Sequence, residues 1–306
     1  MGKALRIGII TAYPEEDWHS KQLIDAANRF GEAVVICPEI LGARLSSFGV
    51  TVLTEVGQLP QVHGFVLARG FGEKGNSDFL VPVYQIMQRT GHILVNGIDP
   101  LLTAVDKFET SYRLQQAGVP TPMVVVAQEV GLAYSVLHEW GRVVAKPLYG
   151  SLGLGIEYLE DTPDGRARLP ELLARFGAVY LQEYVPIPGR DIRAFVVGDR
   201  VAASIYRRVP PGAWKTNIAL GGEPEPCQLD STLERMAVTA ARTIGLDYSG
   251  VDILEGPAGP VVIEVNGNPL WQGLMRATGH NMADVIMAWV VERIRNTTGK
   301  GGEDVA

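Results

Sequence analysis

Residues 250–269, GVDILEGPAGPVVIEVNGNP, decide the fold. Two strand-like runs, VDIL and PVVIEV, are joined by a turn rich in glycine and proline, and this pattern predicts a β-hairpin. Asp252 lies in the first run, whereas Glu264 and Asn266 lie in the second. Side chains two positions apart on a strand point to the same face, so Glu264 and Asn266 project together. Asp252 lies opposite them if the strands pair.

The three oxygen-bearing side chains of this hairpin suggest a site for a hard divalent cation such as Mg²⁺. The alternative is that Asp252 is a turn residue and Glu264 an exposed position of an antiparallel strand, as most carboxylates are. Each acid lies within an apolar run, however, and an unpaired carboxylate is costly to bury. We therefore expect Asp252, Glu264 and Asn266 to be metal ligands.

The composition suits two or three small domains that share a cleft, since the chain has 306 residues and 46% of them are hydrophobic. A net charge of −7 gives no sign of a nucleic-acid partner. The sequence contains no run of about 18 apolar residues, so no membrane-spanning helix is predicted. The N-terminal residues MGKALRIGIITAY favour a first strand over a secretory signal, and Cys37 and Cys227 are expected to be reduced thiols. These features predict a soluble, cytoplasmic protein.

Alternating strand and helix patterns over residues 1–98 predict a parallel α/β domain. We expect strands at 5–10, 33–37, 63–68 and 92–96, and helices at 20–30 and 79–89.

Residues 70–75, GFGEKG, match the G-x-G-x-x-G pattern of dinucleotide-binding proteins. The run follows a late strand, however, and Asn96 stands where an acid is expected at the end of the next strand. We favour a loop at the carboxyl end of a strand, where open α/β sheets often meet their ligands. Arg69 at that strand end is a candidate contact for an anionic substrate.

Residues 142–158, RVVAKPLYGSLGLGIEY, predict two strands around a glycine-rich turn, with Lys146 at the end of the first strand. Backbone N–H groups of such a turn can lie against phosphate oxygens while the lysine supplies a positive charge. The chain contains no G-x-x-x-x-G-K-[ST] sequence, which excludes the P-loop NTPases. Residues 99–117 before it predict one helix that carries Lys107.

Residues 179–184, VYLQEY, predict a further strand, and residues 191–206 predict two strands around a turn at Gly198 and Asp199. A group of cationic side chains follows these strands or lies on them and offers donors for phosphate or carboxylate: Arg193, Arg207, Arg208 and Lys215. A solvated basic turn is the alternative for Arg208. Helices are expected at 230–244 and 282–294, and a frayed tail after residue 296.

Taken in order, these segments resemble the ATP-grasp enzymes, and within them the RimK-type amino-acid ligases. The resemblance covers about residues 99–294. It is carried by Asp106-Lys107, VVAKPLYGSLGLGI, LQEYVPIPGRDIRAFVVGDRVAASIYRR, Lys215-Thr216-Asn217, Gly221-Gly222, GVDIL and IEVNGNP. It implies an α/β (α+β) fold with an N-terminal parallel domain at 1–98. Two α+β subdomains, at 99–185 and 186–296, would clasp ATP, and a flexible tail would follow at 297–306.

The resemblance also implies an ATP-dependent carboxylate–amine ligase that works through an acyl phosphate and releases ADP and phosphate. Lys107 and Lys146 would hold the ATP phosphates, Arg207 would stabilise the oxyanions, and two Mg²⁺ or Mn²⁺ ions would bind Asp252, Glu264 and Asn266. The remaining implied nucleotide contacts are Gly150, Ser151, Gly153 and Gly155 over the phosphates, Glu183 and Tyr184 at the adenine, Asp191 at the ribose, and Lys215, Thr216 and Asn217.

The chain departs from the family pattern near the expected acceptor site. Leu220 precedes the paired glycines where an arginine is common. After Asn266 the chain reads Gly267-Asn268-Pro269-Leu270-Trp271, where a small residue and glycine are more usual. The candidate substrate contacts are Arg69, Arg193, Arg208 and Asn268. Glutamate is the family's commonest added amino acid, and we favour a small acceptor of the pterin or deazaflavin type.

Several alternatives stay open. The alternative acceptors are a protein C-terminal tail and an amino-group carrier protein. A non-catalytic ATP-binding module and a dinucleotide oxidoreductase are hypotheses from other classes. The expected partners are ATP, an amino acid and a carboxylate acceptor, without nucleic acid or membrane, and a homo-oligomer stays open.

Overall fold

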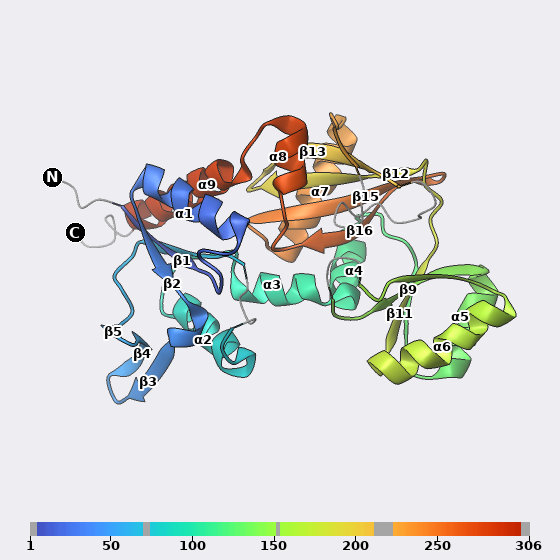
Figure 1. The fold of residues 1–306 in the computed structure, drawn as a ribbon, viewed down its shortest axis with the longest axis horizontal. Helices are drawn as coiled ribbons and strands as arrows, with labels where there is room; N and C mark the ends of the chain where they lie inside the picture. The colour runs from blue at the N-terminus through green and yellow to red at the C-terminus, as the bar shows by residue number, and fades with distance from the viewer. Residues whose placement is uncertain (1–4, 70–73, 151–153, 211–222, 301–306) are drawn as a thin grey trace.

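The computed structural model describes residues 5–69, 74–150, 154–210 and 223–300, except for the side chains of 298–300. Figure 1 shows an N-terminal α/β domain at one end of the long axis, a central subdomain at the other, and a C-terminal subdomain that spans the space between them. This mixed α/β architecture, with a parallel sheet followed by antiparallel sheets, confirms the predicted fold class.

The N-terminal domain is a three-layer unit built on a parallel sheet of order β2-β1-β6-β7. Helices α1 and α9 cover one face of this sheet and α2 covers the other, because apolar side chains alternate between the two faces along β1 and β6. The elements, including α9 from the C-terminal end of the chain, are β1 (Arg6–Ile10), α1 (Trp18–Phe30), β2 (Glu32–Ile36), β6 (Gly64–Leu67), α2 (Ser77–Arg89), β7 (Leu94–Val95) and α9 (Met282–Lys300).

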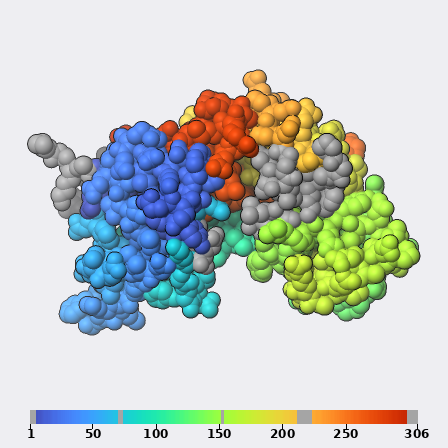
Figure 2. Space-filling model, in the orientation of Figure 1, coloured from blue at the N-terminus to red at the C-terminus, as the bar shows by residue number. Residues whose placement is uncertain are grey.

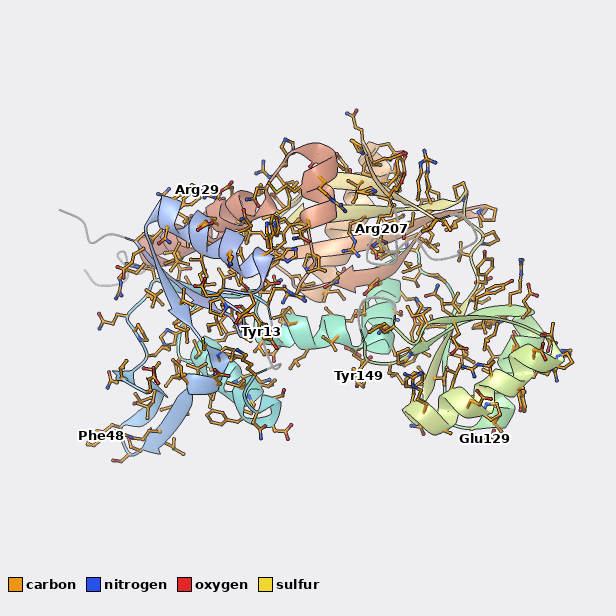
Figure 3. The ribbon with its side chains drawn as sticks, in the orientation of Figure 1. Tyr13, Arg29, Phe48, Glu129, Tyr149 and Arg207 are labelled. Carbon is orange, nitrogen blue, oxygen red and sulfur yellow. The ribbon has the colours of Figure 1, made fainter. Side chains whose placement is uncertain are left out.

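A small antiparallel sheet projects from this domain, and the sequence analysis did not predict it. A 3-10 helix η1 (Pro38–Ile40) leads into β3 (Gly42–Ser46), β4 (Gly49–Thr54) and β5 (Gly57–Gln58). Phe48 lies fully exposed in the turn between β3 and β4, as Figure 3 shows. The strands are short and largely exposed, so their sequence carries little of the apolar alternation from which strands are predicted.

The single helix expected at 99–117 is wrong, since the chain forms two helices, α3 (Ile98–Val105) and α4 (Lys107–Gln116). Asp106 separates them with extended backbone angles (φ −84°, ψ 106°). Its Oδ1 accepts the N–H groups of Phe108 at 2.9 Å and Glu109 at 3.0 Å. An aspartate that caps a new helix in this way satisfies N–H groups that would otherwise have no partner. Lys107 therefore begins α4.

The central subdomain is an antiparallel sheet of order β10-β9-β11-β8 covered by two helices. Its apolar side chains form a core that is separate from the rest of the molecule. The elements are β8 (Val124–Ala127), α5 (Val130–Trp140), β9 (Arg142–Pro147), β10 (Glu157–Glu160), α6 (Pro163–Phe176) and β11 (Val179–Glu183).

The C-terminal subdomain is a five-stranded antiparallel sheet of order β14-β13-β12-β15-β16, and the hairpin quoted at the outset supplies its last two strands. The elements are β12 (Arg190–Val197), β13 (Arg200–Arg208), β14 (Glu223–Pro226), α7 (Ser231–Ile244), β15 (Tyr248–Gly256), β16 (Gly259–Asn266) and α8 (Gln272–Thr278). Helix α9 extends to Lys300, so the flexible tail expected from residue 297 is wrong for 297–300. Residues 301–306 lie outside the described residues. Within the described residues, no helix is long and apolar enough to cross a membrane.

The two faces of the C-terminal sheet have different neighbours. One face packs against α7, α3 and α4 in a core that continues into the N-terminal domain. The other face is apolar at one end, where Phe195, Tyr248 and Trp271 join the core beneath α1 and α9. At its other end this face carries the polar residues described below. The N-terminal domain and the C-terminal subdomain thus share two cores.

Asn96 ties these two parts together. It lies after β7, fully buried, and its side chain makes four hydrogen bonds to backbone groups of the C-terminal subdomain. Nδ2 donates to the carbonyls of Tyr248 (2.8 Å) and Gly267 (2.6 Å), and Oδ1 accepts the N–H groups of Asp247 (2.7 Å) and Tyr248 (3.0 Å). Asn96 therefore fixes the start of β15 and the residue after β16 against the N-terminal sheet.

Replacing Asn96 by Ala is expected to lower the free energy of unfolding by about 2–4 kcal/mol, because buried backbone donors and acceptors lose their partners. Urea denaturation measures the change. Asn296→Ala, at an exposed position of α9, is the matched control and is expected to shift the stability by no more than about 0.5 kcal/mol. Equal stability of the two variants would contradict the role given to Asn96.

Candidate functional site

A cavity of about 350 Å³ lies where the central subdomain meets the C-terminal sheet. Residues of α4, β9, β11 and the segment after β11 line it from one side. The polar end of the C-terminal sheet and helix α8 line it from the other. In Figure 2 a notch at the lower edge of the view separates the central subdomain from the N-terminal domain. The cavity is large enough for a ligand of nucleotide size.

The register of the C-terminal sheet gathers the predicted ligands on one face. Asp252 is paired directly with Glu264 across β15 and β16, and Gly250 is paired with Asn266. A bulge follows at Ile253, which lies opposite Val262, and such an irregularity re-aims neighbouring side chains. Since residues two apart share a face, Asp252, Glu264 and Asn266 project together, and all three line the cavity. The predicted hairpin and its orientation are confirmed.

Two arginines hold Asp252, Arg193 from the adjacent strand β12 and Arg207 from β13 beyond it. Arg193 Nε and Nη2 bind its two carboxylate oxygens, the second at 3.0 Å, and Arg207 Nη2 lies 2.9 Å from its Oδ2. A Cβ atom at Gly250 would lie 2.7 Å from Arg193 Nη1, so only glycine leaves room for this guanidinium. Burial raises the pKa of Asp252, but the charges of Arg193 and Arg207 outweigh that effect and hold the pKa below its ordinary value.

Asp191 holds Arg207 in place from the adjacent strand. Its two oxygens accept from Arg207 Nε at 2.8 Å and Nη2 at 2.6 Å, and both residues are buried. Figure 3 marks Arg207 on this sheet. Burial lowers the pKa of Arg207, but the charges of Asp252 and Asp191 more than compensate and raise it. The carboxylate of Asp191 binds Arg207 and does not line the cavity, and its predicted contact with the ribose stays a prediction.

Two lysines face Glu264 from the other wall of the cavity. Lys146 is buried and donates to Gln182 Oε1 at 2.6 Å. Burial lowers its pKa to about 8, while the charge of Glu264 acts in the opposite direction. Burial likewise lowers the pKa of Lys107, again opposed by Glu264. Ammonium groups that have lost water in this way favour an anionic ligand.

The segment that leads into the glycine-rich turn lies against the junction of α3 and α4. Lys107 Nζ donates to the carbonyl of Gly150 at 3.0 Å and to that of Leu148 at 3.4 Å. Tyr149 Oη donates to Asp106 Oδ2 at 3.1 Å, and Figure 3 shows this tyrosine beside α4. The residue that caps α4 thus also positions the start of the turn.

The cavity brings together many of the predicted site residues: Lys107, Lys146, Gly150, Tyr184, Arg193, Arg207, Asp252, Glu264 and Asn266. Gly155 and Glu183 lie next to lining residues without lining the cavity themselves. Five predicted nucleotide contacts, Ser151, Gly153, Lys215, Thr216 and Asn217, lie outside the described residues, as do Gly70 and Gly72 of the G-x-G-x-x-G run.

Three predicted substrate contacts lie away from the cavity. Arg208 is exposed and donates to Glu225 at 2.6 Å, on the sheet face opposite Arg207. Asn268 Nδ2 donates to the carbonyl of Ala68 at 2.9 Å and so ties the loop after β16 to the N-terminal sheet. Arg69 Nε lies 3.9 Å from Asp17 Oδ1. None of the three lines the cavity, and their role as substrate contacts stays a prediction.

The sequence analysis missed lining residues that have no charge pattern of their own. Gln182 binds Lys146, and the signal that could have found it is a polar side chain inside an apolar strand. Gln272 and Arg276 line the cavity from α8, a helix that was not predicted.

The hairpin offers a metal ion two carboxylates and one amide oxygen. Within the part of the chain that is described, no group of three or more His, Cys, Asp or Glu side chains gathers as a metal site. Oxygen ligands nevertheless match what Mg²⁺ prefers. Asn266 Oδ1 accepts the N–H of Asn268 at 2.9 Å, which fixes the amide. The residues fit a magnesium site in which Arg193 and Arg207 compete with the ion for Asp252.

Residues 104–290 match the family model described as the RimK-like ATP-grasp domain. Among curated proteins, the chain is 30% identical to the tetrahydromethanopterin:alpha-L-glutamate ligase of Methanosarcina acetivorans, over 93% of this chain and 98% of the relative. It is also 30% identical to the glutamate–LysW ligase ArgX of Sulfurisphaera tokodaii, over 68% of this chain and 76% of the relative.

Solved structures share the fold. The ATP-grasp ligase PsnB complexed with its minimal precursor superposes with a TM-score of 0.74 at 19% identity, over 93% of this chain and 98% of that one. The D-alanine–D-alanine ligase from Bacillus anthracis complexed with ATP gives a TM-score of 0.69 at 17% identity, over 98% and 100%.

Replacing Lys146 by Met is expected to stabilise the metal-free protein at pH 7 by on the order of 1–2 kcal/mol, since the buried charge is removed. The pKa of Lys146 falls from its ordinary value of 10.5 to about 8 in the folded protein. Between these values the unfolded chain holds a proton that the folded protein has lost. The free energy of unfolding of the wild type therefore rises with pH relative to that of Lys146→Met. The difference in stability between the two proteins shrinks accordingly.

Urea denaturation from pH 7 to 10 in the presence of a chelator measures this difference. Lys21→Met, at an exposed position of α1, is the control and is expected to show no such trend. A difference between Lys146→Met and wild type that does not change with pH would contradict the assignment.

Proposed function

The chain belongs to the RimK-like ATP-grasp family, and from that premise we propose that it joins glutamate to a carboxylate of a small acceptor with release of ADP and phosphate. The observation that carries the proposal is the position of Lys107 and Lys146 across one cavity from Asp252, Glu264 and Asn266. Desolvated lysines and a set of oxygen ligands that face each other suit a triphosphate with its metal ion.

We assign the nucleotide to the wall that the central subdomain contributes. Lys107 and Lys146 would bind its phosphates, because both ammonium groups have lost water and face Glu264. The adenine would lie against Tyr184, Val185 and Ile187, which supply a largely apolar surface directly after β11. Glu183 would then act through its backbone, since its side chain does not line the cavity.

Glu264, Asn266 and Asp252 would hold two Mg²⁺ or Mn²⁺ ions. When bound, such ions neutralise the charge of the transferring phosphoryl group. Arg207 would stabilise the oxyanions at the reacting carboxylate, and Asp191 keeps its guanidinium in a fixed orientation. The γ-phosphoryl group would pass to the acceptor carboxylate, the amine of glutamate would attack the acyl carbon, and phosphate would leave. The surrounding apolar residues keep water from the acyl phosphate.

The choice of glutamate and of a pterin-type acceptor rests on the relatives, one of which is named for tetrahydromethanopterin and glutamate. A carrier protein is the second candidate acceptor, because another relative is named for glutamate and LysW. The two cysteines, Cys37 and Cys227, are free thiols, and together with the use of ATP they favour a cytoplasmic location.

The test is incubation with ATP, Mg²⁺ and L-glutamate, with tetrahydromethanopterin in one arm and a LysW-type carrier protein in the other. ADP and phosphate are expected to form only with the true acceptor, whose mass grows by one glutamyl residue per turnover. Accumulation of AMP and pyrophosphate, or no ADP above the level without acceptor in any arm, contradicts the proposal.

Replacing Glu264 by Gln is expected to reduce kcat on the order of a hundredfold or more, because a charged metal ligand becomes neutral at unchanged size. Circular dichroism and the thermal midpoint are expected to stay close to those of the wild type. Glu139→Gln, on the exposed face of α5, is the matched control and is expected to keep full activity. A fully active Glu264→Gln protein would remove Glu264 from the proposed metal site.

A further inference from the structure

Helix α8 forms the wall of the cavity that belongs neither to the two lysines nor to the metal-ligand set. It packs across β13 and β14, on the C-terminal subdomain, whereas the lysine wall comes from β9 and α4 (Figure 1). Leu270 and four residues of the helix, Gln272, Gly273, Leu274 and Arg276, line the cavity. The cavity therefore has room at α8 for a group other than the nucleotide.

Gln272 and Arg276 present polar side chains to this part of the cavity. They are four residues apart, one turn along α8, so they lie on the same side of the helix. Both are exposed and both line the cavity, while Leu274 between them is buried. The helix thus presents an amide and a guanidinium to the cavity beside the apolar Leu274, which also lines it.

Arg276 differs from the other cations of the cavity in its surroundings. Arg193 and Arg207 bind Asp252, and Lys146 and Lys107 bind side-chain or backbone oxygens. Within the described residues, no ion pair joins Arg276 to an acid. Its positive charge is therefore available to a ligand.

Strand β14, against which α8 packs, turns its two acids away from the cavity. On β14, Glu223 is paired with Arg208 and Glu225 with Tyr206, which places both acids on the sheet face opposite Arg207 and the cavity. Glu225 already binds Arg208 there.

We propose that Gln272 and Arg276 form the subsite that receives a carboxylate of the non-nucleotide substrate; this deepens the proposed function and rests on it. A guanidinium binds a carboxylate through two parallel N–H groups, and an amide N–H one turn away adds a further donor. The carboxylate comes either from the incoming amino acid or from the acceptor, since each carries one besides the reacting group. The chemistry is the same for both sources, and the experiment separates them.

The test is calorimetric titration of the full-length protein, saturated with Mg²⁺ and a non-hydrolysable ATP analogue, with two probes. L-Glutamate stands for the incoming amino acid. N-Acetyl-L-glutamate, whose amine is blocked, stands for a glutamyl end of the acceptor. We expect Arg276→Gln to raise the Kd of one probe about tenfold or more, because a charge-assisted contact is lost. The probe that is affected identifies the source of the carboxylate.

Two further variants separate the subsite from a general effect of charge. Arg276→Lys keeps the charge and is expected to bind the same probe with an intermediate Kd. Arg208→Gln makes the matched change at an arginine that lies outside the cavity and is expected to leave both Kd values within about twofold of the wild type. The thermal midpoint of Arg276→Gln is expected to be unchanged, since the side chain is exposed.

Equal Kd values for wild type and Arg276→Gln with both probes would overturn the subsite and leave Arg276 as a solvated cation near the end of α8. Failure of both probes to bind the wild-type protein would overturn it as well. Because the titration requires no turnover, these outcomes are distinct from a failure of the ligase assay, in which ADP does not form with any acceptor.

Discussion

Asp252 buries a carboxylate in the middle of a five-stranded sheet, and a charge in that position is tolerated only with close compensation. Arg193 provides it from the adjacent strand β12 and Arg207 from β13, one strand further, and Asp191 holds Arg207 in turn. The antiparallel register places all four side chains on one face, and the same alternation brings Glu264 and Asn266 alongside them. The charged cluster therefore fixes the orientation of Asp252, Arg193 and Arg207 at the cavity.

The same sheet face serves two purposes along its length. At one end it carries this cluster, and at the other it packs Phe195 and Tyr248 into the core beneath α1 and α9. Asn96 reinforces that junction through four buried hydrogen bonds. The central subdomain, in contrast, has a core of its own. The cavity thus lies between a large composite body, which holds the acids, and a smaller unit, which contributes Lys146, Gln182 and Tyr184.

The walls of the cavity carry different kinds of charged groups. Two desolvated lysines face Glu264 on one side, and arginines neutralised by aspartates lie at the centre. The exposed Arg276 lies on α8 at a third wall. A low dielectric strengthens the electrostatic interactions of each cation. The groups that surround a cation therefore strongly affect which anionic ligand it binds. The arrangement suits an enzyme that must hold a nucleotide and a carboxylate substrate together.

Several strands and five of the residues that meet in the cavity follow from the sequence. Short apolar runs predicted β1, β2, β6, β15 and β16, because strands that face a core are rich in apolar residues. The sequence also placed Lys107, Lys146, Asp252, Glu264 and Asn266, which the cavity brings together. The features that it missed leave little trace in the apolar pattern. Asp106 ends one helix and begins the next, and the exposed β3–β5 sheet has no regular pattern.

Only the tertiary structure decided which of the predicted cations and acids face the cavity. Asp191 and Arg208 look like ligand contacts in the sequence, yet each is bound by a partner that the strand register supplies, Arg207 for one and Glu225 for the other. Gln272 and Arg276 carry no signal in the sequence and reach the cavity because α8 packs across β13 and β14. Sequence periodicity records whether a side chain is buried, whereas its partner across the sheet is set by pairing between residues far apart in the chain.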